Sequence, residues 1–160
     1  MRTTYRVLAG AIALLVVIQA AMIAYAIGGV FSWIDAGNTL DKSVVEGWED
    51  NPPDFEGSIG SFFHFFIIGT ILIPLLGLIL LIVSFFAKVP GGVKWALIVF
   101  GVVVLQIALA FLSFGVPGVG ALHGINAIAL LSVALVAARR AAAPAPASAA
   151  AGEPAAEATL

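Results

Sequence analysis

The side chains best suited to chemistry in this sequence are its two histidines, His64 and His123, each a few residues inside a long apolar run. Ionisable residues are rare within membrane segments and usually have a function there. With the topology argued below, each ring lies roughly 5–8 Å inside the exterior end of its helix, at about 1.5 Å per residue. Two neutral imidazoles at matched depth on facing helices predict the axial ligands of a b-type haem.

The residues around the two histidines suit a flat cofactor. A cluster of aromatic side chains beside the first histidine could line such a cofactor, namely Phe62, Phe63, Phe65 and Phe66. Gly120 and Ala127, one turn before and after His123, leave room for a porphyrin edge. Asn126 is placed to hold a propionate or to order a hydrogen bond around the ligating histidine. Gly120 and Gly124 also form a G-x-x-x-G pattern, which favours helix packing.

Two other uses of the histidines stay open. A divalent metal such as zinc or copper is compatible with His64, His123 and the acidic residues of the loop at 31–60. Histidines near a helix end also form purely structural hydrogen bonds between helices. The sequence contains no cysteine, which excludes thiolate metal sites, disulfides and cysteine nucleophiles.

Two glutamines, Gln19 and Gln106, lie near the middle of other apolar runs. An amide in hydrocarbon needs a partner, so we predict that both face the bundle interior and bond to one another. A quinone or proton role is the alternative. No Asp, Glu, Lys or Arg lies deep in a span, which argues against an ion-coupled transporter. We find no catalytic Ser/His/Asp set or phosphate-binding glycine loop, and do not expect an enzyme.

These residues must be positioned by membrane helices. The 160-residue chain is 62% hydrophobic and 10% charged, far from the roughly 25% charge of soluble domains. Its apolar runs predict an all-α bundle of four transmembrane helices, at about 7–30, 61–87, 93–114 and 118–138. Pro74 should kink the second. An acidic loop at 31–60 is expected to cap a cavity between spans two and four, and the Ala/Pro-rich tail at 141–160 to be disordered.

The orientation follows from the basic residues. Only Lys42 falls on one side of this topology; the other side carries Arg2, Arg6, Lys88, Lys94, Arg139 and Arg140. The positive-inside rule then places both termini in the cytoplasm and the chain in the cell membrane. Ala24-Tyr25-Ala26 allows an alternative in which the first run is a cleaved signal peptide.

The stretch from Leu105-Gln106 to Arg139-Arg140 resembles a four-helix integral membrane family of actinobacteria, which carries H-G-x-N-A in its last helix as His123 to Ala127 do here. That resemblance implies the fold and no chemistry. A weaker likeness is to one half of haem A synthase, which has histidines at the exterior ends of its second and fourth helices. Glu56 is too far before His64 to match that enzyme's glutamate, so the likeness implies haem-holding geometry only.

Three functions are therefore compatible with the sequence. The first is a haem-binding or electron-transfer bundle with His64 and His123 as ligands. The second is a non-catalytic accessory subunit that joins a membrane complex or a homo-oligomer through its glycine faces. The third is a lipid- or quinone-binding bundle. The lipid bilayer is the partner common to all three, and no basic patch indicates nucleic acid.

Overall fold

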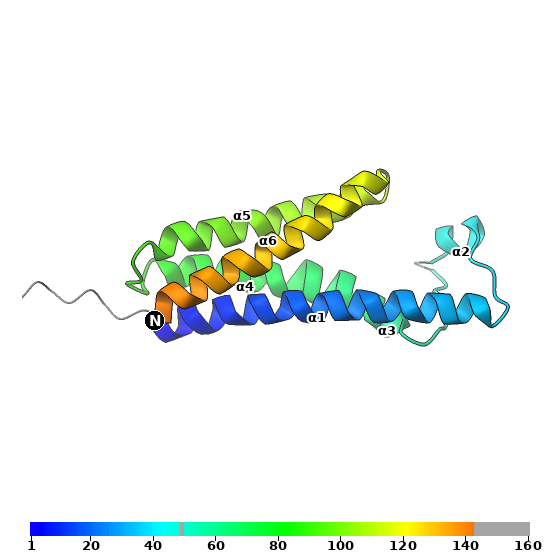
Figure 1. Cartoon of the computed structure of the whole chain (residues 1–160), viewed down its shortest axis with the longest axis horizontal. Helices are drawn as coiled ribbons and strands as arrows, with labels where there is room; N and C mark the ends of the chain where they lie inside the picture. The colour runs from blue at the N-terminus through cyan, green and yellow to red at the C-terminus, as the bar shows by residue number, and fades with distance from the viewer. Residues whose placement is uncertain (49, 143–160) are drawn as a thin grey trace, which may run out of the picture.

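The computed structural model describes residues 1–48 and 50–142 and is all-helical over that range (Figure 1). Four of its helical segments are long and apolar enough to cross a membrane. The chain is thus a multi-pass membrane protein, as predicted. Most of the tail expected to be disordered, 143–160, lies outside the described residues. Residues 141 and 142 belong to the last helix.

The helices follow the predicted spans closely. In order they are α1 (Arg2–Asp35), α2 (Lys42–Glu46), α3 (Ser58–Phe62), η1 (Phe63–Leu72), α4 (Ile73–Ser84), α5 (Gly92–Ser113) and α6 (Pro117–Ala142). The second span is the continuous run of α3, η1 and α4 from Ser58 to Ser84. Helix α1 is longer than predicted and continues to Asp35, beyond the last purely apolar residues.

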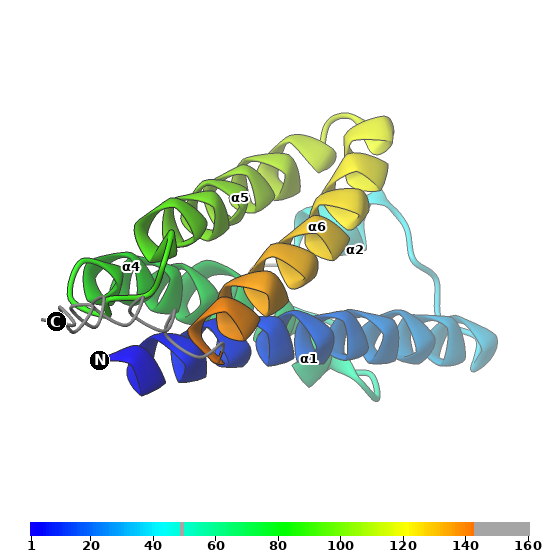
Figure 2. The ribbon, with the colours of Figure 1, turned by 60° about the vertical axis from the view of Figure 1, so that its left-hand side comes forward.

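The spans form two antiparallel hairpins, which we call hairpin one (α1 with α3, η1 and α4) and hairpin two (α5 with α6). They pack most closely near the chain termini, where α6 lies on α1, and they diverge toward the opposite end (Figures 1 and 2). The buried side chains follow this shape. Tyr5, Ile12, Leu80, Val99 and Leu130 are fully buried at or near the closed end. We call the other end the open end.

Three contacts tie the closed end together. The Tyr5 hydroxyl donates to the carbonyl of Gly92 at 3.0 Å, and Arg2 donates to the carbonyl of Ala141 at 2.9 Å. The guanidinium of Arg140 lies 4.9 Å from the ring centre of Trp95, a cation–π distance. The basic ends of all four spans therefore meet at one end of the bundle, as the prediction of orientation requires.

A π-helix precedes Pro74, the residue predicted to kink the second span. The ten residues before α4 form the π-helix η1, in which carbonyls accept from residues five positions later. The N–H of Ile73 donates to the carbonyl of Ile68, and the Thr70 hydroxyl to that of Phe65 at 2.6 Å. Because proline has no N–H, the α-helical bond to Thr70 is missing, and the chain before it takes the wider winding.

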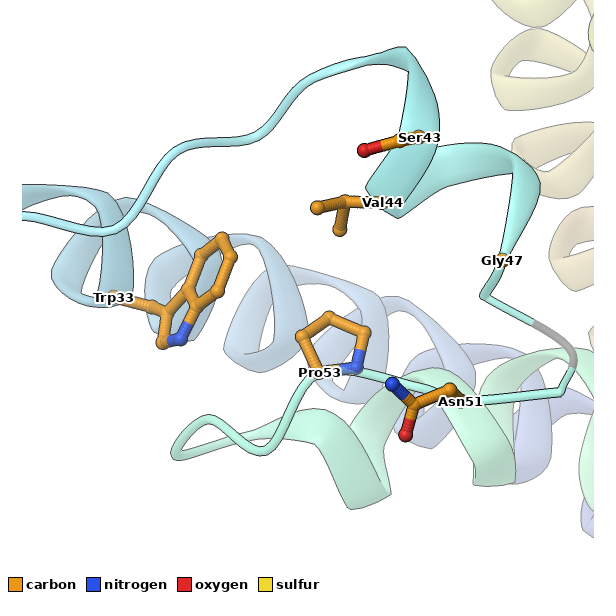
Figure 3. Close-up of a pocket in the computed structure, with 6 residues that line it drawn as sticks. All are labelled: Trp33, Ser43, Val44, Gly47, Asn51 and Pro53. Atoms are coloured by element: carbon orange, nitrogen blue, oxygen red, sulfur yellow. The ribbon is translucent and has the colours of Figure 1, made fainter.

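The acidic loop packs on the outer end of α1 rather than over spans two and four. Phe55 is buried there, and its ring meets that of Trp48 edge-on at 5.9 Å. A pocket of about 280 Å³ opens between α1 and the loop, lined by Trp33, Ser43, Val44, Gly47, Asn51 and Pro53 (Figure 3). The predicted cap over a cavity between those spans is therefore wrong, because the loop's apolar residues are used against α1.

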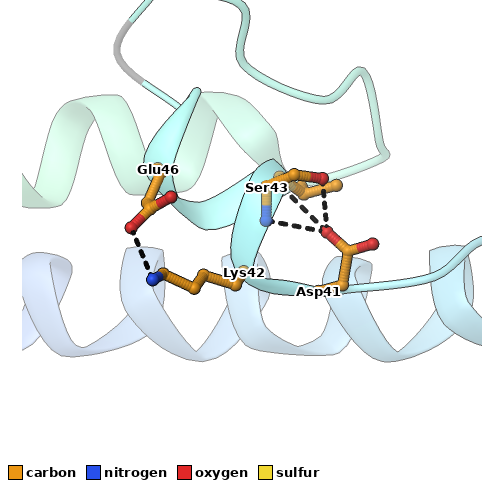
Figure 4. A network of polar contacts seen from close by, with 5 residues as sticks. Asp41, Lys42, Ser43 and Glu46 are labelled. Atoms are coloured by element: carbon orange, nitrogen blue, oxygen red, sulfur yellow. Dashed lines mark hydrogen bonds and ion pairs between the residues drawn. The ribbon is translucent and has the colours of Figure 1, made fainter.

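Helix α2 within this loop is held by its own polar residues (Figure 4). Asp41 caps it by accepting from the Ser43 hydroxyl at 2.6 Å and from the N–H groups of Ser43 and Val44. These bonds, led by the Ser43 hydroxyl, lower the pKa of the exposed Asp41 carboxyl. Lys42 and Glu46 form an exposed ion pair one turn apart, at 3.4 Å, which adds little stability.

Two neighbouring glycines of α1 give a matched test of the loop's docking. A Cβ built on Gly29 would lie 1.5 Å from the carbonyl oxygen of Glu56, whereas one on Gly28 meets nothing within 4 Å. We expect Gly29→Ala to push the loop off α1 and destabilise the protein by about 1–3 kcal/mol. Gly28→Ala should instead be neutral or stabilise the helix by up to about 1 kcal/mol. Limited proteolysis of the loop in detergent measures the difference; equal cleavage in both variants would contradict the packing.

Candidate functional site

Hairpin one contains a reciprocal pair of hydrogen bonds between Gln19 on α1 and His64 on η1. Nδ1 of His64 lies 3.0 Å from the backbone carbonyl of Gln19, and Nε2 of Gln19 donates to the backbone carbonyl of His64 at 3.1 Å. A Cβ on Gly69 would lie 2.5 Å from the Gln19 amide nitrogen. Gly69, which has no side chain, therefore leaves the space that the Gln19 amide occupies. We call this arrangement a clamp.

Hairpin two contains the same clamp between Gln106 on α5 and His123 on α6. Nδ1 of His123 lies 3.2 Å from the carbonyl of Gln106, and Nε2 of Gln106 donates to the carbonyl of His123 at 3.2 Å. Each glutamine thus binds the histidine of its own hairpin. The prediction that Gln19 and Gln106 bond to one another is wrong, because each amide finds a nearer carbonyl on the adjacent helix.

The second clamp has two further bonds. The amide nitrogen of Gln106 also lies 3.1 Å from Nε2 of His123. The buried Asn126 donates its amide N–H groups to the carbonyl of Val102 at 3.1 Å and to Oε1 of Gln106 at 2.6 Å. Because a backbone carbonyl only accepts, Val102 fixes which end of Asn126 is the donor. The Asn126 donor in turn fixes the amide of Gln106, which must donate toward His123.

The same logic fixes the tautomer of both imidazoles. In each clamp Nδ1 faces a backbone carbonyl, which cannot donate, so Nδ1 carries the hydrogen and Nε2 of the neutral ring carries the lone pair. In His123 that lone pair accepts from Gln106. In His64 no residue in the described part of the chain bonds to Nε2. No fully buried side-chain nitrogen or oxygen there lacks a partner, so this atom reaches the protein surface.

Each clamp lies within its own hairpin, and the two hairpins diverge toward the open end (Figures 1 and 2). Phe65, next to His64, stacks edge-on against its ring at 5.0 Å and also meets Phe114 at the end of α5, with ring centres 6.1 Å apart. Phe65 therefore bridges the two hairpins, and all four phenylalanines of the predicted cluster are exposed at the surface.

The remaining predicted site residues are Asn126, Gly120 and Gly124. Asn126 bonds to Gln106, which in turn bonds to His123, so these bonds fit the predicted role of ordering the contacts around the histidine. Gly124 is exposed and a Cβ there would meet nothing within 4 Å, while one on Gly120 would contact only Ser113 at 3.8 Å. No helix of the described chain therefore packs closely on the G-x-x-x-G face. Space beside His123 remains available.

A metal bound jointly by the histidines and the loop carboxylates is not supported. Among residues 1–48 and 50–142, no group of three or more His, Cys, Asp or Glu side chains is placed to share an ion. The loop lies on the outer end of α1, and neither histidine lines the two pockets found there.

Comparison with protein-family models, with curated proteins and with solved structures found no match for this chain. The fold and the site thus define a class only: a small four-helix membrane protein with two histidine–glutamine clamps inside its bundle. The resemblances drawn from the sequence stay predictions.

Sequence reasoning missed the pairing of glutamine with histidine, although a signal was present. Val16-Val17-Ile18-Gln19 and Val103-Val104-Leu105-Gln106 are nearly the same four residues, and each lies on the helix that precedes a histidine-bearing span. An internal repeat at this position would have predicted two like sites.

Proposed function

We propose that this protein binds a b-type haem at the opening between the two hairpins, with Nε2 of His64 and Nε2 of His123 as the axial ligands. The observation that carries the proposal is the hydrogen bond from each Nδ1 to a backbone carbonyl. Histidines that ligate metals commonly use their second nitrogen in this way, which fixes the tautomer and aims the other nitrogen at the metal.

The residues present fit such a cofactor at three points. His64 offers an open Nε2, the phenylalanines around it form an apolar edge, and Gly124 leaves the surface beside His123 uncovered. His123 can ligate once the Gln106 amide leaves its Nε2, and the amide nitrogen can then still donate to the His123 carbonyl. Two histidines on different helices of one bundle are a common way to hold such a group.

The chain's own contribution is to hold and orient the two imidazoles and to shield their nitrogens from water. The two clamps fix the ring planes, and the apolar side chains around them exclude water from the nitrogens. A haem would supply one-electron redox chemistry, with a potential set by its ligands and by the polarity of the site. Electron transfer is therefore the function proposed.

The test is a visible spectrum of the full chain in detergent, after expression with ample haem, before and after reduction with dithionite. We expect a sharp reduced α band, the mark of two strong axial ligands. His123→Ala should convert it to a high-spin spectrum with haem still held by His64. A colourless wild-type protein that takes up no added hemin would overturn the proposal.

A further inference from the structure

The first helices of the two hairpins match at several of their buried positions. When Gln19 is aligned with Gln106, the buried residues Ala9, Ile12 and Val16 fall on Ala96, Val99 and Val103, which are buried as well. The next position agrees too: Val17 and Val104 are both 52% exposed. Both helices run outward from the closed end, so their equivalence is one of direction as well as of sequence.

The second helices match once the π-helix is taken into account. Buried positions follow the same spacing in both, at Ile73, Gly77, Leu80 and Ser84 in α4 and at Leu130, Ala134, Ala137 and Ala141 in α6. From the histidine to the first of these, hairpin one has two residues more. A π-turn takes roughly one residue more than an α-turn, and the ten residues of η1 make about two such turns.

We infer that the chain is two copies of one helix hairpin whose clamps have diverged: the first presents an open Nε2 on His64, and the second keeps Nε2 of His123 closed behind a Gln106–Asn126 latch. The identity of the ligand that the two histidines bind rests on the proposed function, a haem. The latch itself is a property of the chain alone. His64 is then the first ligand to engage, and His123 engages only after the latch opens.

The difference between the copies comes from one position. Asn126 is buried in α6, four residues before Leu130, and the residue four before the matching Ile73 of hairpin one is Gly69, which lies against the Gln19 amide. Glycine has no side-chain donor for Oε1 of Gln19, so nothing equivalent to the Asn126 bond turns that amide toward the imidazole. In hairpin two the short bond from Asn126 holds Oε1 of Gln106 and turns its amide nitrogen onto Nε2 of His123. Asn126 is thus a positioning residue, which acts on the ligand atom through Gln106.

The latch is tested without haem by labelling the purified full chain with diethyl pyrocarbonate, which acylates an imidazole nitrogen that carries a free lone pair. Mass spectrometry of the peptides then gives a rate for each histidine. We expect His64 to react and His123 to be protected. Asn126→Leu should accelerate labelling of His123 by about two- to tenfold, the worth of one ordinary hydrogen bond.

Two more variants keep this test decisive. Gln106→Leu removes the latch from its other side and replaces Asn126→Leu if that variant does not fold, as judged by helical content and gel filtration. Gln19→Leu is the matched control, because Gln19 does not touch Nε2 of its histidine, and it should leave His123 protected. Equal labelling of both histidines in the wild type, or continued protection of His123 in a folded latch variant, would overturn the inference.

Hemin titration of the same variants connects the latch to the haem proposal. Freed from the latch, His123 should bind iron more readily, so Asn126→Leu should raise the affinity of the low-spin form by about two- to tenfold over wild type. An unchanged affinity would show that the latch does not compete with the iron, and would overturn its role toward the ligand. If no variant binds hemin, the haem proposal fails, while the labelling rates still judge the latch.

Discussion

His64→Ala is expected to lose haem altogether, because it removes the one imidazole whose Nε2 is open before any rearrangement. Losing an outer-shell partner of a metal site typically weakens binding by about 10–100-fold, and losing the ligand itself should cost more than about 100-fold. Hemin titration monitored at the Soret band measures the change. The inserted protein itself should be unaffected, since His64 is only partly buried.

A rescue experiment separates ligation from a structural role. His64→Gly leaves space where the ring was, and added imidazole should restore the spectrum of that variant if the nitrogen binds iron. A histidine that only bonds to Gln19 would not be replaced in this way. Wild-type spectra in both His64 variants would contradict the assignment.

Leu80→Ala is expected to give the largest loss of stability among single substitutions in the spans. Leu80 is fully buried in α4 at the closed end. Truncating a buried leucine costs about 2–5 kcal/mol, because packing contacts are lost and a cavity is left. Unfolding by SDS in mixed micelles, followed by circular dichroism, measures it.

Leu78→Ala is the matched control for this substitution, on the same helix and with the same change of side chain. Leu78 is 43% exposed, so it faces lipid or detergent, and we expect a loss below about 1 kcal/mol. Similar losses for the two leucines would show that α4 is rotated from the orientation described here.

The four spans were predictable because a long apolar segment in the hydrocarbon of a membrane has few structures other than a helix available to it. A run of about 20 apolar residues satisfies its backbone only as a helix, whatever its neighbours are. The gathering of Arg2, Arg140 and the residues near Gly92 at one end follows from the same reasoning, since loops between spans alternate sides. The π-helix before Pro74 was not predicted, because a missing N–H is compatible with either a kink or a wider winding.

The partners of the polar side chains were not predictable in the same way. An amide or an imidazole within a span must find a partner, and the sequence established that need for Gln19, Gln106, His64 and His123. Which partner each one has depends on which helices are neighbours and on their rotation. Reasoning from depth alone paired the glutamines with each other, whereas the fold pairs each with the histidine of its own hairpin.

What the sequence by itself determined is thus the number of helices, their lengths, and which residues need a partner inside the membrane. These follow from hydrophobicity and backbone hydrogen bonding, which are local. Only the tertiary structure decided that two clamps exist, that one Nε2 is open, and that Asn126 closes the other. A hydrogen bond requires two atoms within about 3 Å in a suitable direction, and only the packing of one helix on another brings them there.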